Sequence, residues 1–218
     1  MRGHALLWTL VLCLTTAIVT SASAARRDAA ITLALRPSVT ALYQPITAYG
    51  KSGASYAGVT LQFKECGVYP AQFRDVAELP STAGGEWSVS IMPVANGTFR
   101  ATVGPNVSNQ VDVRTRAHVR LTSTRPGRYR AYVEARQAFW HKRIRIERYV
   151  RSRSRWVPLR TVVLARTEAI NSLLIKNVSS KSDEFAVKLP RGTRLRAVFP
   201  LSQAKPCYAA GTSEVVQR

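Results

Sequence analysis

Apolar and polar residues alternate along most of the chain, in short runs. Clear examples are Val59–Phe63, Trp87–Ile91, Tyr129–Val133 and Arg143–Glu147. A period of two residues is typical of β-strands that bury one face. Clusters of glycine, proline and asparagine separate the runs, as at Ala95–Gly97 and Arg125–Gly127. Short strands with turns about every ten residues favour a sandwich or a barrel, so the pattern predicts an all-β fold.

The first 24 residues have the pattern of a secretory signal peptide. A positive start at Arg2 precedes an apolar stretch that runs to about Val19, and small residues follow it. This arrangement predicts cleavage between Ala24 and Ala25 and an exported, soluble mature protein. An uncleaved membrane anchor is the less favoured alternative, because the apolar stretch is shorter than the ~20 residues of a bilayer span.

An internal repeat sets the predicted number of domains. The matched segments are Val59–Gln62 with Ile144–Glu147, Phe73–Val76 with Leu159–Val162, Glu86–Val89 with Glu184–Val187, and Thr98–Ala101 with Thr193–Ala197. The spacing drifts from about 85 to about 98 residues, as expected when loops differ between two copies. We therefore predict a signal peptide at 1–24, a first domain at 25–114 and a second domain at 115–218.

Three segments carry a resemblance to a known family. They are the strand entry Thr82–Trp87, the segment Pro93–Arg100, and its second-copy counterpart Pro190–Arg196. With them, the chain resembles tandem bacterial immunoglobulin-like domains behind a signal peptide, as in secreted proteins of actinobacteria. The resemblance covers most of Ile31–Val216 and implies two tandem Ig-like β-sandwiches. It also implies a role as a spacer, an adhesive or a wall-associated module.

The cysteines are interpreted through this resemblance. Cys13 leaves with the signal peptide, so the mature chain has only Cys66 and Cys207. In a head-to-tail pair of such domains, the end of the third strand of one meets the loop before the last strand of the next. The resemblance therefore implies a Cys66–Cys207 disulfide within one chain, which would make the protein a stiff two-domain rod. Pairing with another molecule and two unpaired thiols are the alternatives.

Charge is distributed very unevenly along the chain. The protein has 32 Lys and Arg against 12 Asp and Glu, a formal net charge of +20. Residues 28–114 carry six basic and six acidic side chains, whereas residues 115–218 carry 23 basic and six acidic ones. Since Ile144 and Ile146 are expected to face the core, Arg143 and Arg145 are expected to face water. The arginines selected as candidate polyanion-binding residues are Arg128, Arg130, Arg143, Arg145, Arg148, Arg151, Arg153, Arg155, Arg194 and Arg196.

These features favour a secreted, non-catalytic protein. Its basic second domain is expected to associate with anionic cell-envelope or extracellular polymers such as cell-wall polymers or acidic polysaccharides, because arginine binds phosphate and carboxylate bidentately. No nucleophile, paired-carboxylate or metal-ligand pattern is recognisable, so no catalysis, metal or cofactor is expected. Export argues against intracellular nucleic acid as the partner. The alternative is a purely structural or protein-binding module for adhesion or spacing, in which arginine serves only solubility.

Overall fold

The computed structural model describes residues 31–171 and 176–218. The expected signal peptide and its cleavage site at Ala24 and Ala25 lie outside the described residues. Within the described ranges, strands form nearly all of the regular structure, with one 3₁₀ turn, η1 (Arg151–Arg153), and one short helix, α1 (Leu201–Ala204). The expectation of an all-β fold is therefore confirmed. None of the helices in this part of the chain is long and apolar enough to cross a membrane.

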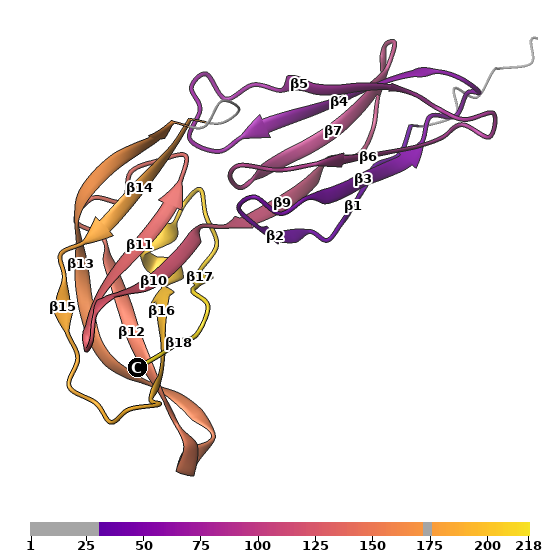
Figure 1. Cartoon of the computed structure of the whole chain (residues 1–218). Coiled ribbons are helices and arrows are strands. Elements are labelled where there is room, and N and C mark those ends of the chain that lie inside the picture. The colour runs from indigo at the N-terminus through magenta and orange to yellow at the C-terminus, as the bar shows by residue number, and fades with distance from the viewer. Residues whose placement is uncertain (1–30, 172–175) are drawn as a thin grey trace, which may run out of the picture.

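The first lobe is built from two sheets (Figure 1). One sheet has the order β1-β3-β6, and the other has the order β2-β9-β7-β4-β5, with β8 paired to β7. The strands are β1 (Ala34–Arg36), β2 (Val39–Ala41), β3 (Ile46–Lys51), β4 (Gly58–Glu65), β5 (Arg74–Pro80), β6 (Glu86–Ile91), β7 (Gly97–Val103), β8 (Asn106–Val107) and β9 (Val111–Arg116). Alternate residues of β4, such as Val59 and Leu61, are fully buried, as the two-residue period requires.

The second lobe is one continuous nine-stranded sheet of order β10-β11-β14-β13-β12-β16-β17, with β15 paired to β11 and β18 to β16. Its strands are β10 (His118–Arg125), β11 (Arg128–Ala135), β12 (Arg143–Val150), β13 (Arg155–Asn171), β14 (Lys176–Ser182), β15 (Phe185–Ala186), β16 (Arg194–Phe199), β17 (Gly211–Thr212) and β18 (Val216–Gln217). The first part of β13 pairs with β12, and the part after Leu164 pairs with β14. Since β14 also pairs with β11, the β13–β14 hairpin joins two sheets into one.

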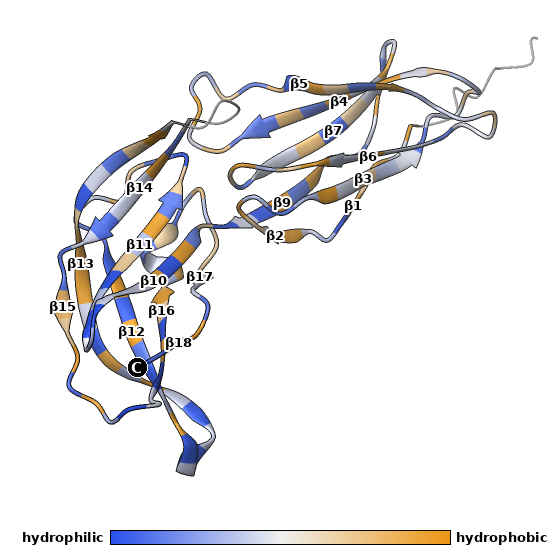
Figure 2. Cartoon of the chain, viewed as in Figure 1, coloured by the Kyte–Doolittle hydropathy of each residue, from blue (hydrophilic) through white to orange (hydrophobic). Residues whose placement is uncertain are grey.

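This lobe is nearly barrel-like, because β10, at one end of the strand order, lies against β16 and β17 at the other. It therefore differs from the two separate sheets that a simple sandwich would have. The physical reason is the length of β13, which continues past a register shift between Leu164 and Arg166 and forms a ladder with β14. Figure 2 shows hydrophobic and hydrophilic residues alternating along several strands of both lobes, including β10 and β12.

The described residues form two hydrophobic cores, one in each lobe. Trp87 and Phe99 lie in the first, and Tyr129, Phe139 and Phe199 lie in the second. At ~25 cal/mol per Å² of apolar surface removed from water, each core supplies the main stabilising contribution for its lobe. The lobes meet at an angle (Figure 1), so the two-lobed molecule is bent where they join.

Equivalent hydrogen bonds recur in the two lobes. On β7, the Ala101 amide donates to the Ser108 hydroxyl at 2.8 Å, and that hydroxyl donates to the next carbonyl along the chain. On β16, the Ala197 amide donates to the Ser213 hydroxyl at 2.9 Å, which again donates to the next carbonyl. These contacts relate β7 to β16, in line with the sequence match around Ala101 and Ala197.

A disulfide joins the lobes. Cys66 follows β4 and Cys207 follows α1, with a Cα–Cα distance of 5.2 Å and a sequence separation of 141 residues. The implied Cys66–Cys207 bond is therefore confirmed. Because such bonds persist mainly in oxidising compartments, it supports a location outside the cytoplasm.

Hydrogen bonds surround this disulfide. The backbone amide of Asn96 donates to the Cys207 carbonyl at 2.9 Å, and its side-chain amide donates to the Pro206 carbonyl at 3.0 Å. The hydroxyl of Tyr208 donates to the Val94 carbonyl at 2.8 Å. Burial raises the pKa of Tyr208 to about 12, because desolvation disfavours its phenolate. The two lobes are thus held together by a covalent bond inside a hydrogen-bonded seam.

An ion pair lies beside the seam. Arg136 of the second lobe donates to the Glu65 carboxylate of the first at 3.1 Å. Burial raises the pKa of Glu65, although the charges of Arg136 and Arg74 oppose the rise. The pair stabilises the seam electrostatically, but its contribution to stability is small because Arg136 is exposed to solvent.

Candidate functional site

The arginines selected from the sequence fall into three groups in the second lobe. Arg128 and Arg130 lie on β11, near β15 and β14. Arg143, Arg145 and Arg196 lie along the paired strands β12 and β16. The third group is at the end of the lobe that lies farthest from the seam: Arg148, Arg151, Arg153, Arg155 and Arg194.

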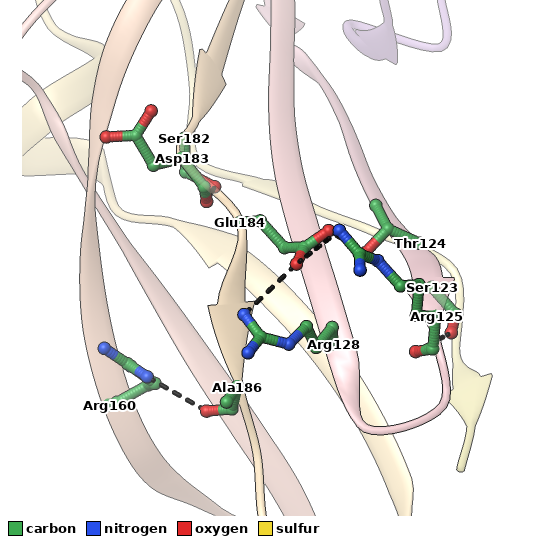
Figure 3. A network of polar contacts seen from close by, with 9 residues as sticks. All are labelled: Ser123, Thr124, Arg125, Arg128, Arg160, Ser182, Asp183, Glu184 and Ala186. Atoms are coloured by element: carbon green, nitrogen blue, oxygen red, sulfur yellow. Dashed lines mark hydrogen bonds and ion pairs between the residues drawn. The ribbon is translucent and has the colours of Figure 1, made fainter.

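The first group is partly neutralised by Glu184 (Figure 3). Arg128 donates to the Glu184 carboxylate at 3.2 Å, and Arg125 lies 3.8 Å from the same oxygen. The Thr124 hydroxyl also donates to this carboxylate at 2.7 Å, and this hydrogen bond is the main cause that lowers the pKa of Glu184. Two guanidinium groups thus share one carboxylate, so this part of the surface keeps a net positive charge. Arg130 differs, because its Nε atom is buried without a hydrogen-bond partner among the described residues.

The second group is organised around Glu147. Arg145 donates to one oxygen of this carboxylate at 2.8 Å, and Arg196 approaches the other at 2.7 Å. Glu147 is only 4% exposed, because the two guanidinium groups cover it. The Arg196 guanidinium also lies 4.4 Å from the centre of the Trp156 ring. Arg145 lies on the outer face, but its charge is largely occupied within the protein.

The first lobe has an equivalent arrangement in which a glutamine replaces the glutamate, and that glutamine also donates to the Asp75 carboxylate at 2.7 Å. Gln62 is paired in register with Arg100, as Glu147 is with Arg196. Arg100 donates to the Gln62 side-chain oxygen at 2.6 Å, and its guanidinium lies 4.1 Å from the Phe73 ring. A glutamine in one lobe and a glutamate in the other therefore hold an arginine against an aromatic ring.

Two members of the third group, Arg151 and Arg194, line a cationic pocket of about 210 Å³ at the far end of the lobe. We call it the tip pocket, and its lining residues are Tyr149, Arg151, Arg191, Gly192, Thr193 and Arg194. Arg151 comes from the turn between β12 and β13, and Arg191 and Arg194 come from the segment that enters β16. Arg194 lies 5.1 Å from the Tyr149 ring, which packs edge to face against Trp156 at 5.4 Å.

Gly192 allows this segment to turn. Its φ of +76° is a conformation that side chains with a Cβ rarely adopt. Its amide donates to the Arg218 carbonyl at 2.8 Å, and the Arg218 amide donates to the Thr193 carbonyl at 3.1 Å. The turn thereby places Arg191 and Arg194 on the same pocket.

The tip arginines have no acidic partner nearby. In residues 31–171 and 176–218, no carboxylate lies within 4.0 Å of the guanidinium groups of Arg148, Arg151, Arg153, Arg155, Arg191 or Arg194. All of these residues are exposed. Arg191 was not among the arginines selected from the sequence, although the Pro190–Gly192 turn next to Arg194 was the signal that could have identified it.

Two further features bear on the chemistry that the described residues could support. No group of three or more His, Cys, Asp or Glu residues that could hold a metal ion is found in the described part of the chain. A hollow of about 620 Å³ lies on the first lobe, with Tyr49, Lys51, Glu86 and Trp87 among its lining residues. The sequence did not predict this hollow, and its few charged groups form no nucleophile or acid–base pair.

No protein-family model and no curated protein matches the chain. Among solved structures, it is distantly similar to the native conformation of Escherichia coli alpha-2-macroglobulin, with 11% identity and a TM-score of 0.33. The match covers 88% of this chain but only 17% of the macroglobulin chain. A similarity this distant carries no argument about function.

Proposed function

We propose that this is an exported, non-catalytic protein whose second lobe binds anionic polymers of the cell envelope or the extracellular space. The observation that carries the proposal is the position of the charge. Residues 115–218 have 23 basic and six acidic side chains, and six arginines that have no carboxylate within 4.0 Å among the described residues gather at the end farthest from the first lobe. A surface of this kind attracts any polyanion, and arginine adds bidentate contacts to phosphate or carboxylate.

The same proposal includes two tandem Ig-like domains, at 25–114 and 115–218. The recurring Ala–Ser hydrogen bonds and the matched pairs Gln62–Arg100 and Glu147–Arg196 support it. In this interpretation the β13–β14 hairpin is an addition that joins the two sheets of the second copy. The seam fixes the orientation of the lobes, so the neutral first domain positions the basic one.

Co-sedimentation of the mature, disulfide-bonded protein with washed bacterial envelopes tests this function. We expect retention at about 0.15 M salt that falls steeply as salt rises, because each neutralised anion releases counterions. The variant R151Q/R153Q/R155Q should lose most of this retention. The control R36Q/R74Q/R114Q removes the same charge from exposed positions of the first lobe and should retain binding.

Two results would contradict the proposal. The first is an absence of retention at low salt, which would leave the charge as a solvated surface. The second is retention that does not respond to salt, which would favour a protein partner and a spacer or adhesion role.

A further inference from the structure

Corresponding ends of the two lobes have different surroundings: in the first lobe this end contacts the other lobe, and in the second lobe it forms the tip pocket. The matched pairs Gln62–Arg100 and Glu147–Arg196 define which positions are equivalent. Counting four residues onward from Gln62 and Glu147 makes Arg151 the counterpart of Cys66. Counting four back from Arg100 and Arg196 makes Gly192 the counterpart of Asn96.

In the first lobe, these positions form a contact surface. Cys66 is bonded to Cys207, and Asn96 donates both of its hydrogen bonds to the second lobe. In the second lobe, the equivalent end is the tip pocket, where Arg151, Arg191 and Arg194 line a hollow of about 210 Å³. The end that binds a protein neighbour in one copy is therefore, in the other, a concave site lined by three guanidinium groups.

We infer that the tip pocket binds a phosphate group of an anionic polymer, an inference that rests on the proposed function and adds a specific site to it. The guanidinium groups come from two separate segments, the β12–β13 turn and the Arg191–Arg194 segment that leads into and begins β16. A tetrahedral phosphate presents oxygens in more directions than a planar carboxylate, so it suits donors that converge from different directions. The volume accommodates a small group rather than a whole polymer segment.

The neighbouring aromatic side chains complete the site. Tyr149 forms part of the pocket wall, and Arg194 lies over both Tyr149 and Trp156, at 5.1 and 5.9 Å from their ring centres. Packing against two rings restricts the Arg194 side chain, so less conformational entropy is lost when it binds an anion. Arg191 and Arg151 are exposed and can close on the anion from the rim.

The test is calorimetric binding of inorganic polyphosphate to the disulfide-bonded protein at about 0.15 M salt. The variant R191Q/R194Q should lose about tenfold or more in affinity relative to the control R120Q/R166Q, which removes two exposed arginines elsewhere in the same lobe. The variant R191K/R194K keeps the charge and should still bind more weakly than the unchanged protein, because lysine cannot make the bidentate contact.

Equal losses in the pocket and control variants would overturn the pocket and leave the general polyanion function standing. No binding by the unchanged protein to polyphosphate or envelopes would overturn both. Equal affinity for polygalacturonate, with the same dependence on Arg191 and Arg194, would overturn the preference for phosphate. Binding to phosphatidylglycerol vesicles without binding to polyphosphate would overturn the assignment to a polymer.

Discussion

Removal of the Cys66–Cys207 bond should lower the stability of the protein measurably. The bond closes a loop of 141 residues, and the chain-entropy relation gives about 5 kcal/mol for a loop of that length. This value is an upper figure, because residual structure in the unfolded chain reduces the effect. For the variant C66A/C207A, we therefore expect the free energy of unfolding to fall by about 2–5 kcal/mol.

Urea unfolding followed by circular dichroism and tryptophan fluorescence measures this loss. The matched control is the protein with its natural sequence in the reduced state, which lacks the bond but keeps both sulfur atoms. Comparing it with the variant separates the loss of loop entropy from the loss of packing around the buried Cys207. The bend between the lobes should persist in small-angle scattering, since the Asn96 and Tyr208 hydrogen bonds do not involve sulfur. A loss below about 1 kcal/mol in both samples would refute the entropic reasoning.

Three further predictions follow from the seam, the second-lobe surface and the tip. Glu147→Gln should lower the free energy of unfolding by about 1–2 kcal/mol in urea titrations, because its two charge-assisted hydrogen bonds, to Arg145 and Arg196, become weaker; an unchanged free energy of unfolding would contradict this role. The free energy of unfolding should fall as pH rises from about 10 towards 12, because the pKa of Tyr208 is about 12 in the folded protein and near 10 when unfolded. The variant Tyr208→Phe should be less stable at pH 8 but should lose much of this alkaline dependence. An unchanged dependence in the variant would contradict the role of Tyr208 in it. Gly192→Ala should weaken polyphosphate binding with a loss of stability of about 1 kcal/mol, because its φ of +76° is strained for alanine; unchanged affinity would show that the turn does not shape the pocket.

Local pattern was sufficient for the strands and, with the family resemblance, for the disulfide. The alternation in Val59–Phe63 and Arg143–Glu147 places β4 and β12 correctly because a buried face requires a period of two. Cys66 and Cys207 could be paired because each lies at a predictable end of its lobe.

Long-range pairing could not be read from the same pattern. The extension of β13 past Leu164 is set by its ladder with β14, and neither partner carries a local signal for the other. Periodicity likewise showed that Arg145 faces outward, but not that Glu147 would neutralise it together with Arg196. Arg191 was missed because its role depends on how the turn beside β16 meets the β12–β13 turn.

The most direct test of the central claim is to observe the arginine side chains during binding. In nuclear magnetic resonance spectra of the Arg Nε–Hε groups, titration with polyphosphate should shift the signals of Arg151, Arg191 and Arg194 strongly and saturably. The signals of Arg36, Arg74 and Arg114 in the first lobe should move little. Small, uniform shifts across all arginines, without saturation, would contradict a binding site at the tip of the second lobe.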